Sequence, residues 1–242
     1  MNVLAIGAHG DDIEEFCGGT LARHARQGDK VVMCVVTDGR GNPQGNPDEI
    51  ARIRKGEAQA SAELIGAELV WLAVPDGGLV VNQETRHLFI ETIRAADPEY
   101  VITHPPQDYH PDHIATSQLV MQAEQVAATP NYPSRFTPIR RSVPLAFMAA
   151  ECGVDFAPED YVDVSDLWDV KLNMLLQHRS QLMPGSKYDP NYALPKNPID
   201  QGMVREARIM SEFYGLACNV RYAEAFRWWR AAGRILPKRL LP

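Results

Sequence analysis

Short apolar runs alternate with longer segments of helical periodicity from residue 1 to about residue 128. Strands are expected at 2–8, 30–37, 68–74 and 100–103, and helices at 11–27, 48–65, 83–96 and from 113 to about 128. Strands that alternate with helices of this length pair in parallel through right-handed crossovers. The sequence therefore predicts an α/β fold, with a Rossmann-like, mostly parallel sheet and helices on both faces.

Two proline-rich stretches interrupt the pattern in the second half of the chain. They hold Pro130, Pro133, Pro138 and Pro144, and then Pro184, Pro190, Pro195 and Pro198. Around the two stretches we expect strands at 145–151 and 161–164 and one helix over 166–181. Long loops in a compact domain are often binding loops, so we place both at the mouth of a site. The alternative is that they only connect surface elements.

Charge and composition exclude several kinds of partner. With a net charge of −7, the chain lacks the clustered Lys and Arg that bind nucleic acid. No segment approaches the roughly 18 apolar residues of a membrane span, and no signal peptide is evident, so we expect a cytoplasmic protein. Cys17, Cys34, Cys152 and Cys218 are widely spaced, and we expect them to be buried, reduced thiols.

Two clusters of imidazoles and carboxylates follow predicted strands. The segment His9–Asp12 ends the first strand, and His110–His113 follows the fourth. Ligands in an open α/β sheet are held at the carboxyl ends of strands, so both clusters are expected in one crevice. Helix capping explains either cluster alone, but it does not explain the pair.

The ligand types in these clusters predict a catalytic metal centre. Catalytic zinc commonly takes three ligands from His, Asp or Glu and keeps a position open for water. His9, Asp12 and His113 make that set, because a turn at Gly10 brings the first two together. If Pro111 is the first residue of a helix, His113 also faces the cavity. We expect one Zn²⁺ per chain, with iron, cobalt or nickel as alternatives.

The other polar residues of the clusters have expected roles in catalysis. Asp11 is left without a metal to bind and is our general base. His110 is expected to donate a hydrogen bond to the developing oxyanion. We expect Asp112 to fix the tautomer or charge of His110 through a hydrogen bond. The residues together predict a hydrolytic site.

Motifs spread over much of the chain resemble the PIG-L/LmbE-like N-acetylglucosaminyl deacetylase family. They are Ala8–Asp12, Gly18–Thr20, Arg54 with Glu57, Pro75–Leu79 and His110–His113. In addition, Tyr222–Phe226 is similar to the closing segment of the branch that deacetylates N-acetylglucosaminyl malate in bacillithiol synthesis. The resemblance implies a zinc-dependent amide hydrolase on a Rossmann-like fold, with the ligands and base assigned above.

The resemblance also implies roles for residues outside the ligand set. By correspondence, His110 is the electrophilic histidine, and Arg54 helps to hold the substrate or orient the site. Without the resemblance, Arg54 reads as a solvated charge on a helix. The family usually has proline where this chain has Gly10. Relatives also use a tyrosine near the oxyanion, for which Tyr188 and Tyr192 are the candidates.

We therefore expect a single domain, 1–242, that removes the N-acetyl group from an N-acetylglucosamine conjugate and releases acetate and a free amino sugar. Residues 1–128 form the Rossmann-like half with the metal site, and residues 129–242 supply the substrate loops and a C-terminal helical part. A homo-oligomer is expected from the resemblance. Two alternatives are an amidase acting on a larger sugar thiol conjugate or acylated glycopeptide, and a sugar- or nucleotide-binding module without catalysis.

Overall fold

A seven-stranded sheet in the order β3-β2-β1-β4-β5-β7-β6 forms the centre of the molecule. The computed structural model describes residues 1–41, 45–182, 189, 192–194, 197–231 and 241–242. The strands are β1 (Asn2–Gly7), β2 (Lys30–Thr37), β3 (Glu68–Val74), β4 (Tyr100–Thr103), β5 (Leu145–Met148), β6 (Asp160–Asp163) and β7 (Ala223–Trp228). Strands β1 to β5 pair in parallel, and β7 runs antiparallel to both of its neighbours.

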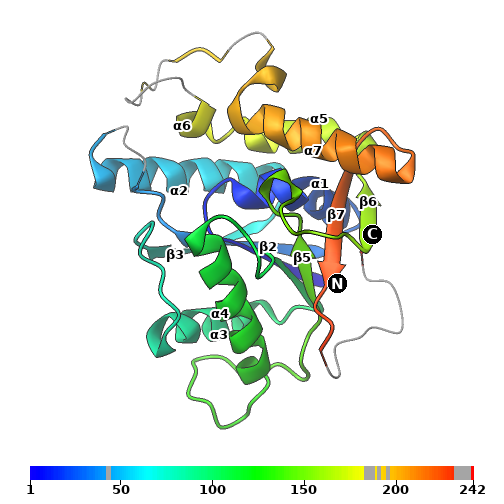
Figure 1. Ribbon diagram of the computed structural model, residues 1–242. Helices are drawn as coiled ribbons and strands as arrows, with labels where there is room; N and C mark the ends of the chain where they lie inside the picture. The colour runs from blue at the N-terminus through cyan, green and yellow to red at the C-terminus, as the bar shows by residue number, and fades with distance from the viewer. Residues whose placement is uncertain (42–44, 183–188, 190–191, 195–196, 232–240) are drawn as a thin grey trace.

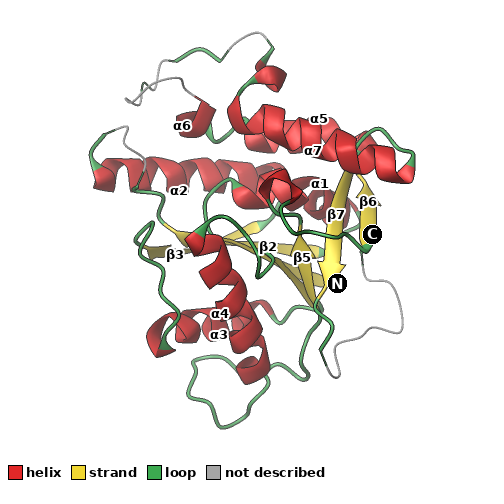
Figure 2. Cartoon of the chain, in the orientation of Figure 1, coloured by secondary structure: helices red, strands yellow, loops and turns green. Residues whose placement is uncertain are grey.

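Helices cover both faces of this sheet (Figures 1 and 2). One layer contains α1 (Asp12–Arg26), α2 (Pro47–Leu64), α5 (Trp168–Leu175), α6 (Arg179–Leu182) and α7 (Gly202–Cys218). The other contains α3 (Gln83–Ala96) and α4 (Pro111–Ala127). Short 3₁₀ helices lie at Glu151–Gly153, Ser165–Leu167 and Pro198–Asp200. No helix within the described ranges is long and apolar enough to cross a membrane.

Alternate residues of β1 supply two separate hydrophobic cores. Val3 and Ala5 pack in the cluster that contains the α1 residue Ile13. Leu4 and Ile6 belong to the cluster on the other face, between the sheet and the helices α3 and α4. Because successive strand residues point to opposite faces, a strand covered on both sides reads as one continuous apolar run. This burial explains why β1 is recognisable from sequence.

The sequence prediction for the first half of the chain is confirmed. Each strand and helix up to residue 128 begins and ends within two residues of its predicted bounds. The single-domain α/β fold with a mostly parallel sheet is also confirmed. The strand predicted at 145–151 is shorter, because it ends at Met148.

The single helix predicted over 166–181 is wrong. The structure has a 3₁₀ turn, then α5, then a break before α6. At the break, the backbone N–H of Ser180 donates to the Glu57 carboxylate at 2.7 Å and not to a carbonyl one turn back. His178 is fully buried, with Nε2 3.0 Å from Oε1 of Glu14. These tertiary contacts outweigh local helical periodicity.

Helix α7 lies in the region where a C-terminal helical part was expected without bounds, and β7 was not predicted. Strand β7 inserts between β5 and β6, so the halves 1–128 and 129–242 contribute to the same sheet. The expected burial of the cysteines is correct for Cys17 and Cys34 and wrong for Cys218, which is exposed. Those three cysteines are free thiols.

Candidate metal centre and active site

The two predicted clusters meet at the carboxyl ends of β1 and β4, which are neighbours in the sheet. From β1 the chain first adds β2 and β3 on one side and then adds β4 on the other side. Open α/β sheets bind ligands at the carboxyl ends of the strands where the strand order reverses in this way. His9 lies in the loop after β1, and Asp12 is the first residue of α1. His110 is the N-cap of α4, Pro111 is its first residue, and His113 lies in its first turn, as predicted.

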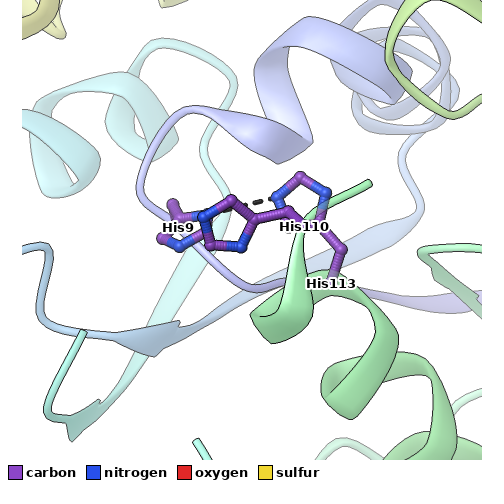
Figure 3. A group of neighbouring side chains, drawn as sticks. All are labelled: His9, His110 and His113. Carbon is purple, nitrogen blue, oxygen red and sulfur yellow. Dashed lines mark hydrogen bonds between the residues drawn. The ribbon is translucent and has the colours of Figure 1, made fainter. Parts of the chain in front are cut away.

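The three residues of the predicted metal set lie close together, with a different oxygen of Asp12 facing each imidazole. Nδ1 of His9 lies 3.2 Å from Nε2 of His113 and 3.4 Å from Oδ2 of Asp12. Nε2 of His113 lies 3.4 Å from Oδ1 of Asp12. Zinc–nitrogen bonds of about 2.0–2.1 Å in a tetrahedron separate two ligand atoms by about 3.3 Å. The donor types and their spacing therefore fit a divalent transition metal, and Figure 3 shows His9 and His113 facing one another.

Carboxylates lie behind both imidazoles of this set. Nε2 of His9 is 3.3 Å from Oδ1 of Asp76 and 3.5 Å from Oδ2 of Asp112. Nδ1 of His113 is 3.2 Å from Oδ1 of Asp108. Histidines that bind metals almost always donate their other ring N–H to a carboxylate, carbonyl or water, which fixes the tautomer. Asp76 and Asp108 were not predicted, because nothing local in the sequence pairs them with these histidines.

The same carboxylates shift the acid–base equilibria of the two imidazoles. Burial lowers the pKa of His9, but Asp12 and Asp112 outweigh burial and raise that pKa well above its usual range. Burial also lowers the pKa of His113, but Asp12 and Asp108 outweigh burial and raise that pKa to about 9. A metal ligand must be a neutral imidazole, so a cation competes with protons for this site.

Asp11 lies beside the ligand set, and a buried arginine holds it. Nη2 of Arg54 donates to Oδ1 of Asp11 at 3.0 Å. Arg54 extends from α2 and is only 5% exposed, so its interpretation as a solvated surface charge is wrong. The contact engages one carboxylate oxygen of Asp11, which lines the cleft.

His110 is oriented by a main-chain contact. Its Nδ1 accepts a hydrogen bond from the backbone N–H of Asp112 at 3.2 Å, so the neutral ring carries its proton on Nε2. Burial and the neighbouring imidazoles His9 and His113 lower the pKa of His110, which favours this neutral form. The predicted contact between the Asp112 carboxylate and His110 is wrong. That carboxylate accepts from the backbone N–H of Gly77 at 2.9 Å and lies beside His9.

His104 is a site residue that sequence reasoning missed. Its ring stacks on that of His113 with centroids 4.0 Å apart, and its Nε2 lies 3.0 Å from Oδ2 of Asp12. Burial and His113 lower the pKa of His104 to about 4, so it is neutral at pH 7. It directly follows β4, and the rule that placed the two clusters at strand ends was sufficient to find it.

An open cleft of about 440 Å³ lies over these groups. Asp11, Arg54 and His110 line it, together with Tyr109, a tyrosine that was not predicted. Burial and Glu151 raise the pKa of Tyr109, so its hydroxyl keeps its proton. Of the two predicted tyrosines, Tyr188 lies outside the described residues. Tyr192 is not among the described residues that line the cleft, and its backbone carbonyl accepts a hydrogen bond from Arg179.

A known protein family matches this part of the chain. The PIG-L family, described as GlcNAc-PI de-N-acetylase, matches residues 4–124, a range that includes both clusters and Arg54. The chain belongs to the PIG-L family. The family resemblance expected from the sequence motifs is thus confirmed, and in this PIG-L chain the match covers β1 through most of α4.

Several proteins are similar to this PIG-L chain over most of its length. Diacetylchitobiose deacetylase from Thermococcus kodakarensis is 30% identical over 235 residues, covering 93% of this chain and 82% of the relative. The structure of N,N'-diacetylchitobiose deacetylase from Pyrococcus horikoshii superimposes with a TM-score of 0.79 at 28% identity and covers 94% and 83% of the two chains. A 4-oxalmesaconate hydratase from Pseudomonas putida is 26% identical over 182 residues, covering 70% of each chain.

Gly10, where this PIG-L chain departs from the expected motif, lies close to Arg54. A Cβ atom at this position would lie 3.7 Å from Nη2 of Arg54, which is ordinary van der Waals contact. A Cβ atom at position 10 therefore requires no movement of Arg54.

Proposed function

We propose that this protein is a zinc-dependent N-deacetylase that hydrolyses the acetamide of an N-acetylglucosamine conjugate to acetate and a free amino sugar. The observation that carries the proposal is the convergence of the side chains of His9, Asp12 and His113 beside Asp11 and His110 in one cleft. The similarity to diacetylchitobiose deacetylase over 93% of the chain supports the reaction type.

His9, Asp12 and His113 would hold the ion. When bound, the ion supplies a Lewis acid that polarises a carbonyl and lowers the pKa of water. Zinc is favoured because two imidazoles and one carboxylate are a common ligand set of catalytic zinc. Iron, cobalt and nickel accept the same donors and are the alternatives to zinc.

Asp11 is the group that moves the proton. Arg54 engages its Oδ1, which leaves Oδ2 free to accept a proton from the attacking water. The water oxygen bonds to the carbonyl carbon and makes a tetrahedral oxyanion. Asp11 then returns the proton to the amine nitrogen as the carbon–nitrogen bond breaks. One residue thus acts as base and acid in a single turnover.

His110 stabilises the oxyanion. Because Nδ1 of His110 accepts the N–H of Asp112, the proton on Nε2 is available to a substrate oxygen. A neutral donor of this kind strengthens its hydrogen bond as negative charge develops. Asp112 therefore contributes to catalysis through its backbone N–H on His110 and through its carboxylate near His9.

Arg54 and Asp76 are proposed to contact the sugar, because both line the cleft and carry polar groups suited to hydroxyls. Tyr109 is a further donor at the same place. Tyr188, Tyr192 and the loops of 129–242 stay predicted contributors to binding of the group attached to the sugar.

Acetate release from a substrate panel tests the function. Metal-loaded protein is incubated with N-acetylglucosamine, N,N'-diacetylchitobiose, N-acetylglucosaminyl malate, a bulky sugar thiol conjugate and 4-oxalmesaconate. We expect acetate and free amine in equal amounts from at least one N-acetylglucosaminide. Cleavage of the thiol conjugate alone points to the amidase, and hydration of 4-oxalmesaconate to a hydratase. Stoichiometric metal and sugar binding without turnover points to a binding module.

We further propose that the enzyme works in the cytoplasm as a homo-oligomer. Free thiols at Cys17, Cys34 and Cys218 support a reducing compartment. Cell fractionation and light scattering of the purified protein measure location and oligomeric state.

A further inference from the structure

The loop after β2 approaches the site arginine at a residue that has no side chain. Gly39 has φ +65°, and a Cβ atom there would lie 2.5 Å from Cδ and 2.7 Å from Nε of Arg54. Real Cβ atoms essentially never come within 3.0 Å of a neighbour, so any other residue at position 39 forces something to move. The atoms that it meets lie in the middle of the arginine side chain, not at a free end.

Arg54 has little freedom to move away. It is 5% exposed, and its Nη2 is bound to Oδ1 of Asp11. Gly10 also lies near this side chain, where a Cβ atom would be 3.7 Å from Nη2, an ordinary contact distance. The Arg54 side chain therefore lies near two glycines, one in each of the loops that follow β1 and β2, and only Gly39 is too close to it to accept a Cβ atom.

The backbone around Gly39 is anchored as well. The N–H of Asp38 donates to the carbonyl of Val74 at 2.9 Å. Oδ1 of Asp38 accepts from the backbone N–H groups of Arg40 at 3.1 Å and Asp76 at 3.2 Å. The N–H of Gly41 in turn donates to Oδ2 of Asp76 at 3.1 Å. Because these bonds fix the loop on both sides of Gly39, Arg54 must give way to an added Cβ.

We propose that Gly39 is a positioning residue, whose missing side chain creates the slot that holds Arg54 against Asp11. The kinetic part of this inference rests on the proposed deacetylase function. The steric part, a collision between residue 39 and Arg54, is independent of any activity.

Gly66 provides a matched control. It follows α2, is exposed, has φ +67° and has no atom within 4 Å of a Cβ built on it. An alanine causes similar backbone strain at both positions, because both glycines have a positive φ. Only at position 39 does its Cβ atom also collide with Arg54. Gly39→Ala and Gly66→Ala are made in the natural chain and in an Arg54→Ala background, and Tm, metal content, kcat and KM are measured.

In the natural chain we expect Gly66→Ala to lower Tm by about 2–4 °C and to leave kcat unchanged. Gly39→Ala should lower Tm at least twice as much and lower kcat by about 10- to 100-fold at full metal content. In the Arg54→Ala background, both glycine variants should lower Tm equally, and Gly39→Ala should cause no further loss of kcat. The proposal would be overturned if Gly39→Ala and Gly66→Ala lowered Tm equally in the natural chain. It would also be overturned if the extra loss of Tm in Gly39→Ala were just as large in the Arg54→Ala background.

Two safeguards keep the test decisive. If the double variant does not fold, Gly39→Asn and Gly66→Asn replace it, because asparagine accepts a positive φ and leaves the collision at position 39 as the difference. If the natural chain releases no acetate from any substrate, the proposed function fails. The Tm comparison still decides whether Gly39 positions Arg54.

Discussion

Nδ1 of His9 lies 3.2 Å from Nε2 of His113, although the two residues are 104 positions apart in the chain. The parallel pairing of β1 with β4 produces this contact, because Ile6 opposes Thr103 at the ends of the two strands. The proposed metal ligands are therefore positioned by the sheet, and the residues around them can be tested one role at a time.

The adjacent residues Asp11 and Asp12 should not be interchangeable. We expect Asp11→Asn to keep its metal and to lower kcat by about 10²- to 10⁴-fold, because the proton acceptor is lost. Asp12→Asn should lose the metal itself, because a ligand oxygen is removed. Metal emission spectroscopy and acetate release on the same samples measure both effects. A kcat of Asp11→Asn equal to that of the natural chain would show that Asp11 is not the base.

Asp108 should act through metal affinity. Its Oδ1 lies 3.2 Å from Nδ1 of His113, so Asp108→Asn weakens the hold on a ligand imidazole. We expect affinity for zinc to fall by about 10- to 100-fold in competition with a chromophoric chelator. Asp169→Asn, an exposed change on α5, is the control for losing one negative charge. Equal affinities of the two variants would remove Asp108 from the site.

His110 should affect turnover and not metal content. His110→Ala removes the Nε2 donor, and we expect kcat to fall by about 10²- to 10³-fold with little change in KM. His110→Gln, whose amide can still donate, should retain part of the activity. Nitrogen atoms of His9, His110 and His113 also lie within 4.8 Å of one another. Loss of metal from His110→Ala would therefore assign His110 to the ligand set.

His24 should make the fold sensitive to acid. Burial lowers the pKa of His24 below its usual value of 6.5, against the opposing effect of Asp29. Below pH 6.5 the unfolded chain binds a proton at His24 that the folded chain resists, so stability is lost as pH falls. We expect the decrease in Tm between pH 8 and pH 5 to be smaller in His24→Gln.

Measuring kcat of His24→Gln at pH 7 tests whether the substitution leaves the active site intact. His24 contacts Tyr100, at the start of β4 and at the opposite end of this strand from the cleft. Turnover should therefore stay at the level of the natural chain. An unchanged dependence of Tm on pH would contradict the role of His24.

The sequence was sufficient to predict the elements that local pattern determines and to place the proposed ligands beside one of them. Strand β1 is apolar because both of its faces are buried, and His9 and Asp12 stand directly beside it. Arg54 was placed at the site only by the family resemblance, because a charged residue on a helix looks exposed until the loop that contains Gly39 packs against it. His104 could have been found from its place directly after β4, whereas the role of Asp108 depends on the way the loop before α4 brings it beside His113.

The break between α5 and α6 shows a second limit of sequence reasoning. Residues 166–181 have helical periodicity throughout, yet Glu57 captures the N–H of Ser180 from a helix more than a hundred residues earlier. The sequence of residues 166–181 does not show that a distant carboxylate will bind this N–H group. Strand β7 was missed for a related reason, because it pairs with β5 and β6 far from its own position in the sequence.

The separation of His9 from His113 also has a consequence during protein synthesis. A ribosome that adds about 5–20 residues per second exposes the first cluster roughly 5–20 s before the second. Of the three proposed ligands, the emerging chain holds only His9 and Asp12 during that interval. We therefore expect the site to reach its full affinity for a metal only after β4 has joined β1 and brought His113 beside His9.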